Sequence, residues 1–174
     1  MKRVLILHGW GGSDHPHWQS YIAAEVAREY GCVSFLRFSD ADLPNRDRWL
    51  NELKAEVEAF KPTVVVCHSI ANILWFHLCN DDLDLRLEKL FLVAPPSLSC
   101  DIKELASFYP CEIPQDLMSK EALLISSDND PYMSYKEVCE LAKDLGVELH
   151  TIKGGGHINT DSGYGEWKWL LGEI

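Results

Sequence analysis

Short segments that are apolar at every position alternate along this chain with longer amphipathic segments. "VLIL" (4–7) and the valines of "TVVVC" (63–67) are apolar on both faces, which is typical of strands in a parallel sheet covered by helices on both sides. The strand-like segments are 4–7, 32–38, 63–67, 89–94, 122–126 and 149–152. The amphipathic segments, where apolar residues return every three or four positions, are 17–30, 46–60, 70–79, 135–145 and 163–171. The sequence therefore predicts an α/β fold with about six mostly parallel strands and helices on both faces.

The size of the chain suits one domain. It has 174 residues, 47% of them hydrophobic, which is enough to bury a core, and we expect a single domain over 1–174. Segment 95–121 interrupts the alternation with four prolines and is too short for a separate cap domain. We expect it to form a partial rim around a site, through Pro95, Pro96, Phe108 and Tyr109.

The charge and composition of the chain exclude some classes of binding partner. The formal net charge is −11, which argues against nucleic acid, because phosphate recognition draws on clustered Lys and Arg. No apolar stretch approaches the roughly 20 residues that span a bilayer, and "MKRVLIL" reaches His8 and glycines too soon for a signal peptide. The six cysteines form no C-x-x-C pair, which fits a reducing compartment. We expect a cytoplasmic protein that binds neither nucleic acid nor membrane.

A serine stands in the turn between a strand-like and a helix-like segment, in "VVVCHSIANILWF" (64–76). In a sharp strand-to-helix turn the serine hydroxyl is exposed above the sheet edge, and the following helix offers free backbone N–H groups. Ser69 therefore stands where a nucleophile is expected. Cys67 and Ala71 replace the glycines of the common G-x-S-x-G pattern, and both are small enough for the close packing of such a turn. Alternatively, Ser69 only caps helix 70–79.

Two later turns carry an acid and a histidine in a suggestive order. Asp130 follows the fifth strand-like segment, and His157 follows the sixth within "GGGHINT". The triads of α/β-hydrolases run along the chain as Ser, acid, His. His157 would accept and return the Ser69 proton, and Asp130 would orient its ring. Asp128 competes for the acid role, but we prefer Asp130, because Pro131 restricts its backbone, and assign Asp128 to an Asx turn.

The loop after the first strand-like segment, "LHGWGGSDHPHWQSY", should lie beside the Ser69 turn. A developing oxyanion needs two N–H donors, which we assign to the backbones of Ile70 and Trp10. Gly9 lets the main chain approach closely. The loop contains neither G-x-x-x-x-G-K-[ST] nor G-x-G-x-x-G, so a nucleotide cofactor is not predicted.

The same loop contains two histidines, which are common metal ligands. His15 and His17, with Asp14 nearby, do not have the spacing of a metal site, and we predict no metal. We expect both histidines to be exposed, with His17 and Trp18 opening the first helix.

Together, "LHGWGGSDHPHWQ", the His-Ser turn, "DNDPY" and "GGGHIN" resemble the small cap-less serine hydrolases of the α/β-hydrolase fold, the family that includes the retinoblastoma-binding serine hydrolase. The likeness spans essentially the whole chain. It implies a three-layer α/β-hydrolase fold with no large cap domain, and esterase-type hydrolysis without a cofactor. It also implies a catalytic triad of Ser69, Asp130 and His157. It further implies an oxyanion hole formed by the backbone N–H groups of Trp10 and Ile70. It does not extend to retinoblastoma binding, because no L-x-C-x-E motif is present.

The leading hypothesis is a carboxylesterase-like serine hydrolase that forms an acyl-enzyme with a small ester, thioester or amide, from a small molecule or a peptide. The sequence indicates no particular protein partner. The alternative is a binding protein that keeps the fold but has lost turnover. This alternative is suggested by the replacement of both glycines of the G-x-S-x-G pattern. A third interpretation, redox sensing through Cys67, would require an exposed thiolate of low pKa.

Overall fold

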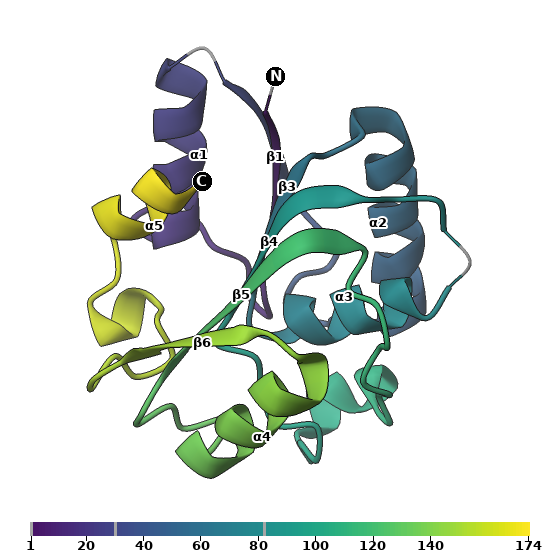
Figure 1. Ribbon diagram of the computed structural model, residues 1–174, viewed down its shortest axis with the longest axis vertical. Coiled ribbons are helices and arrows are strands. Elements are labelled where there is room, and N and C mark those ends of the chain that lie inside the picture. The colour runs from purple at the N-terminus through teal and green to yellow at the C-terminus, as the bar shows by residue number, and fades with distance from the viewer. Residues whose placement is uncertain (1, 30, 82) are drawn as a thin grey trace.

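The computed structural model describes residues 2–29, 31–81 and 83–174, and a six-stranded sheet lies at its centre (Figure 1). The strands are β1 Arg3–Leu7, β2 Cys32–Leu36, β3 Val64–His68, β4 Leu87–Val93, β5 Ser119–Ser127 and β6 Glu148–Ile152. The helices are α1 Trp18–Arg28, α2 Arg46–Phe60, α3 Ile70–Cys79, α4 Tyr135–Leu145 and α5 Lys168–Glu173, with 3-10 turns η1 Lys103–Phe108 and η2 Thr160–Ser162.

The strand order places a topological switch at the centre of the sheet. The order is β2-β1-β3-β4-β5-β6, and every neighbouring pair is parallel. The chain leaves β1 toward β2 on one side and leaves β3 toward β4 on the other. The loops that follow β1 and β3 therefore diverge, which opens a crevice at the carboxyl ends of these strands, where ligands bind in such sheets.

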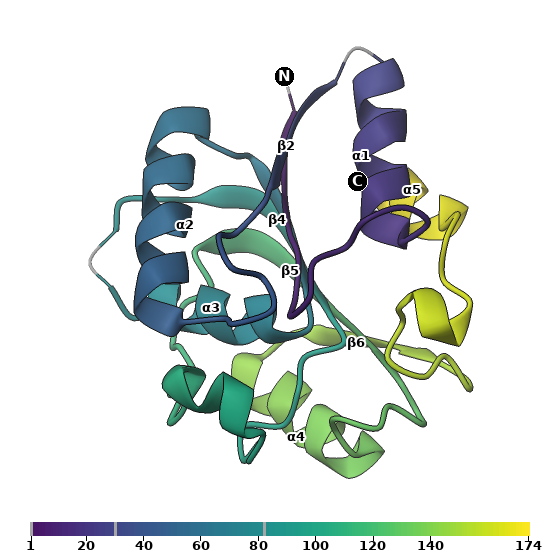
Figure 2. The ribbon, with the colours of Figure 1, turned by 180° about the vertical axis from the view of Figure 1, so that it is seen from behind.

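Helices cover both faces of the sheet, as the continuous apolarity of the strands predicts (Figures 1 and 2). Alternate side chains of one strand point to opposite faces. Leu5 and Leu7 of β1 pack with α2, α3 and α4, whereas Val4 and Ile6 pack with α1 and α5. The prediction of an α/β sheet with two helical layers is confirmed, and the sheet is parallel throughout.

The C-terminal helix does not have its predicted bounds. The periodicity predicts a helix over 163–171, but α5 begins at Lys168. Gly163 ends η2 in the left-handed region, with φ of 86°, so the chain turns there instead of starting a helix. Trp167 then packs against Trp18 of α1, with ring centroids 5.1 Å apart. Tyr164 packs edge-on against Trp167, with ring centroids 5.3 Å apart, so these aromatic residues are packed without forming a helix.

No helix within the described ranges is long and apolar enough to cross a membrane.

Candidate active site

Ser69 occupies a strained turn between β3 and α3. Its φ and ψ are 56° and −128°, a left-handed backbone that costs energy for any residue with a side chain. Its N–H donates to the carbonyl of Val93 at the end of β4, at 3.0 Å. The Ser69 side chain makes no capping hydrogen bond to α3. The interpretation of Ser69 as a mere helix cap is therefore not supported.

The small residues that flank the turn are fully buried. Cys67 and Ala71 have 0% exposure, so their size matters for the packing beneath the turn, and Ser69 adopts its strained conformation without glycine at either position. Burial raises the pKa of the Cys67 thiol well above its ordinary value. A thiol of this kind is inert, which argues against redox sensing at this site.

Ser69, His157 and Asp130 form one chain of hydrogen bonds. His157 Nε2 lies 2.9 Å from Ser69 Oγ, and His157 Nδ1 lies 2.9 Å and 3.1 Å from the two Asp130 carboxylate oxygens. The Asp130 side chain is 0% exposed, and it also accepts the backbone N–H of Tyr132 at 2.9 Å. A neutral His157 that donates from Nδ1 to Asp130 accepts the Ser69 hydroxyl proton at Nε2.

The two aspartates of the β5 loop have different tasks. Asp128 is exposed and accepts the N–H of Gly154 at 2.7 Å. Asn129 accepts the N–H of Gly156 at 2.8 Å. Asp128 and Asn129 thus hold the glycine-rich loop before His157, whereas Asp130 contacts the His157 ring itself. This geometry agrees with the preference for Asp130 and with the Asx-type role assigned to Asp128.

The loop after β1 crosses directly over the serine. A Cβ placed on Gly9 would lie 2.8 Å from Ser69 Cβ, so no larger residue fits there without movement. His8 fixes the loop: its Nδ1 lies 2.7 Å from the Gly9 carbonyl, and its Nε2 accepts the N–H of Phe38 at 2.9 Å. Burial lowers the pKa of His8, which favours this neutral form. The close approach to Ser69 is thus made by Gly9, the residue before Trp10.

Ile70, the second residue that the sequence assigns to the oxyanion hole, directly follows Ser69 in the chain. It is the first residue of α3, and the first N–H groups of a helix have no intrahelical acceptor. Both proposed oxyanion donors therefore come from chain segments adjoining Ser69, one from each side of the sheet's switch point.

Two histidines that the sequence did not assign to the site also line it. His68 Nε2 donates to the His157 carbonyl at 3.1 Å, and its ring centroid lies 5.2 Å from that of His157. His17 is 6% exposed, so the expectation that it lies exposed on the surface is wrong. Its ring packs against those of Trp18 and His68, with centroids 5.4 Å and 5.0 Å away, and its Nδ1 accepts the N–H of Gln19 at 3.2 Å. Burial lowers the pKa of His17 to about 4 and that of His68 well below its ordinary value.

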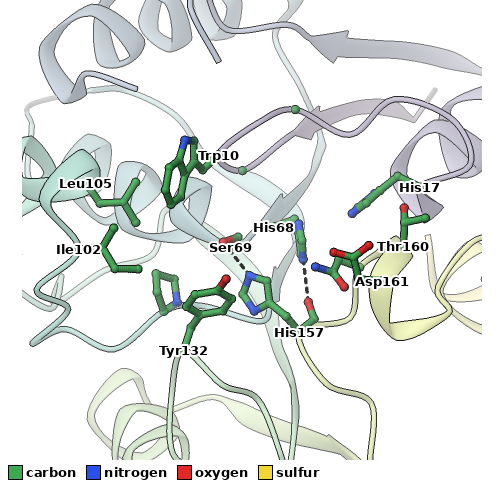
Figure 3. Close-up of a pocket in the computed structure, with 14 residues that line it drawn as sticks. Trp10, His17, His68, Ser69, Ile102, Leu105, Tyr132, His157, Thr160 and Asp161 are labelled. Atoms are coloured by element: carbon green, nitrogen blue, oxygen red, sulfur yellow. Dashed lines mark hydrogen bonds between the residues drawn. The ribbon is translucent and has the colours of Figure 1, made fainter. Parts of the chain in front are cut away.

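A cavity of about 210 Å³ opens at Ser69 and His157. This is smaller than the 300 Å³ or so at which pockets for drug-sized ligands begin. Around Ser69 and His157, the side chains that line it are of two kinds (Figure 3). The apolar and aromatic ones are Trp10, Pro96, Ile102, Leu105 and Tyr132, and the polar ones are His17, His68, Asn159, Thr160 and Asp161.

The segment 95–121 does contribute a rim, but with other residues than expected. Pro96 lines the cavity together with Ile102 and Leu105, whereas Pro95, Phe108 and Tyr109 are absent from its lining. Phe108 is fully buried and packs edge-on against Trp49, with ring centroids 5.7 Å apart. The η1 turn explains the difference, because it turns Leu105 toward the cavity and Phe108 toward the core.

Among the residues that the structure describes, no three His, Cys, Asp or Glu side chains come together as a metal site would require. The cluster of His17, His68 and His157 is instead organised by backbone partners and by Asp130.

A parallel sheet with helices on both faces, and a serine, a histidine and an acid meeting at its switch point, define a protein of the α/β-hydrolase fold. The chain belongs to the serine hydrolase family, which it matches over residues 4–172, and it is therefore a hydrolase.

The chain is also similar to a curated relative and, in its fold, to several solved structures. The chain is 24% identical over 172 residues to YdeN of Bacillus subtilis strain 168, named as a hydrolase, covering 94% of this chain and 89% of YdeN. The crystal structure of the B. subtilis ydeN product has a TM-score of 0.86 at 20% identity, covering 99% and 96% of the two chains. A YdeN-like hydrolase from Pectobacterium atrosepticum has a TM-score of 0.80 at 23% identity, covering 99% and 88%. An esterase domain from Rhodothermus marinus has a TM-score of 0.63 at 12% identity, covering 93% and 80%.

Proposed function

We propose that this hydrolase cleaves a small carboxylic ester, with thioesters and amides as chemically related substrates, through a covalent acyl-enzyme on Ser69. The observation that carries the proposal is the continuous relay from the buried Asp130 through His157 to the Ser69 hydroxyl at a cavity. The modest size of that cavity favours a small-molecule substrate over a folded protein.

The first half of the reaction forms the acyl-enzyme. Ser69 Oγ attacks the carbonyl carbon as its proton passes to His157 Nε2, and Asp130 stabilises the resulting imidazolium. The carbonyl oxygen becomes an oxyanion that accepts hydrogen bonds from the backbone N–H groups of Trp10 and Ile70. The bond to the leaving group then breaks as His157 gives its proton to that group.

The second half releases the acid. A water molecule gives a proton to His157 Nε2 and attacks the acyl carbon, so that a second oxyanion forms in the same place. Collapse of this intermediate breaks the bond to Ser69 Oγ, which takes its proton back from His157. The strained backbone of Ser69 supports this role, because such strain gathers at catalytic nucleophiles.

Labelling with a fluorophosphonate probe tests the proposal. The wild-type protein should be labelled and should hydrolyse 4-nitrophenyl acetate, and Ser69→Ala should abolish both. Ser99→Ala, which removes a hydroxyl outside this cavity, is the matched control and should keep both. Folded wild-type protein that is neither labelled nor active would instead support the binding protein that has lost turnover.

A further inference from the structure

The lining of the cavity divides at Ser69 and His157 into two halves of opposite character. Trp10, Ile102 and Leu105 lie on one side of the pair in Figure 3, and His17, Thr160 and Asp161 lie on the other. An ester has two parts, the acyl group and the alcohol, that extend in different directions from the carbonyl carbon. A cavity with unlike halves therefore discriminates between them.

His17 presents a hydrogen-bond donor to the polar half. Its Nδ1 accepts the Gln19 N–H, so in the neutral ring the proton resides on Nε2. Burial of His17 keeps this neutral form, with a pKa of about 4. Within the described part of the chain, Nε2 has no hydrogen-bond partner, although the residue is only 6% exposed. His17 lines the cavity, and an N–H there that has no protein partner favours a ligand that brings an acceptor.

Asp161 presents the opposite chemistry to the same half. Its carboxylate lines the cavity beside Thr160, and it can only accept hydrogen bonds when ionised. The wall that carries these groups is held together, because the Trp18 indole donates to the Ile158 carbonyl at 2.7 Å. The start of α1, with His17, is thus fixed against the loop that carries Asp161.

We propose that the half lined by His17 and Asp161 is a leaving-group subsite for an alcohol that carries further hydroxyl groups, as in glycerol or a sugar. A hydroxyl can accept from His17 Nε2 and donate to Asp161. An ammonium group would satisfy Asp161 but leave the His17 donor without a partner, and an anion would be repelled by Asp161. The apolar half then takes a short acyl chain. This inference rests on the proposed function of Ser69 and His157.

Esters that share one acyl group test the subsite. Glycerol monobutyrate, propyl butyrate and butyrylcholine differ only in the alcohol, which is polyhydroxylated, apolar or cationic. The kcat/KM of the wild-type protein should be about tenfold higher for the glycerol ester than for the propyl ester, as one or two well-placed hydrogen bonds would give. Butyrylcholine should gain no such preference.

Substitutions then assign the preference to the two residues. Asp161→Ala, which removes the acceptor of an exposed residue, and His17→Asn should each lower the glycerol-to-propyl ratio toward one. Asparagine at position 17 keeps an acceptor for the Gln19 N–H but offers no donor at the Nε2 position. Glu166→Gln removes an exposed carboxylate of the same segment that does not line the cavity, and it should leave the ratio unchanged.

The outcomes separate the subsite from the underlying reaction. Hydrolysis of all three esters without preference, or a preference that both variants retain, would overturn the subsite while leaving the nucleophile in place. A preference for butyrylcholine would overturn it in favour of a cation site. If no ester is hydrolysed and the fluorophosphonate probe does not label Ser69, the proposed function and the subsite fail together.

Discussion

Gly9 and Gly11 lie two residues apart in the same loop, but each is needed for a different reason. A Cβ on Gly9 would meet Ser69 Cβ at 2.8 Å, whereas a Cβ on Gly11 would meet nothing within 4 Å. Gly11 instead has a φ of 78°, where an L side chain is strained. Gly9→Ala should therefore lower kcat/KM about 5- to 150-fold, which corresponds to about 1–3 kcal/mol of overpacking at the site.

The matched variant Gly11→Ala should behave in the opposite way. It should lower the free energy of unfolding by about 1–2 kcal/mol, the cost of a left-handed alanine, and change kcat/KM much less than Gly9→Ala does. Urea unfolding and ester hydrolysis measure the two effects. Equal losses of activity in both variants would show that the close approach of Gly9 to Ser69 is not the limiting contact.

The two aspartates of the β5 loop give a second comparison of single residues. Asp130→Asn cannot hold the proton of His157 on Nδ1 in the same way, and kcat should fall about 10³–10⁴-fold, as such a change does in serine protease triads. Asp128→Asn keeps an oxygen for the Gly154 N–H and should cost less than about threefold. The reverse ranking would assign the acid role to Asp128.

At the scale of an element, the first turn of α3 is tied to the sheet by a buried asparagine. Asn72 Nδ2 donates to the carbonyls of Ser69 at 2.7 Å and Val93 at 2.9 Å. Asn72→Ala should lower the free energy of unfolding by about 1–3 kcal/mol. It should also lower kcat, because the strained turn at Ser69 loses the hydrogen bonds that hold it against β4. Asn80→Ala, at the exposed end of the same helix, should cost less in urea unfolding and leave kcat unchanged.

The sequence predicts the elements where side-chain pattern alone decides them. The valines of β3 and the periodic residues of α2 carry their own signal, since burial on two faces or on one stripe fixes the residue types. Asn72 carried a weaker signal, a lone amide in an otherwise apolar helix, which only its contacts explain. The start of α5 could not be predicted. Trp167 contributes to the apolar periodicity of 163–171, but it packs against Trp18 from outside the helix.

The residues of the site also divide into those that local sequence pattern predicts and those that only tertiary contacts explain. The meeting of Ser69, Asp130 and His157 could be predicted because each follows a strand and the chain order is informative. His17 could not, because its burial depends on the way the loop after β1 folds back between His68 and the His157 loop. Ile102 and Leu105 line the cavity through the turn of η1, which no periodicity indicates.

At the scale of the whole molecule, buried histidines make stability depend on pH. An unfolded His17 titrates near 6.5, but in the folded protein burial lowers its pKa to about 4. Between these values the unfolded chain binds a proton that the folded protein does not, so stability is lost as the pH falls through this window. His17 alone should account for about 2 kcal/mol of lost unfolding free energy between pH 7 and pH 5, and His68 acts in the same direction.

Urea unfolding at the two pH values, in the wild-type protein and in His17→Asn, measures this contribution. The variant should lose about 2 kcal/mol less than the wild type on going from pH 7 to pH 5. An equal loss in both proteins would mean that other groups cause the acid sensitivity.

The strand order also governs when the molecule becomes competent during its synthesis. Ser69 follows the third strand, but His157 follows β6, the last strand, which pairs only with β5 at the sheet's edge. On the proposed mechanism, a nascent chain on the ribosome can therefore form the Ser69 turn before His157, the proposed general base, has been synthesised. Under that proposal the Ser69 hydroxyl stays unreactive until β6 pairs with β5, and the onset of hydrolysis would mark the completion of the sheet.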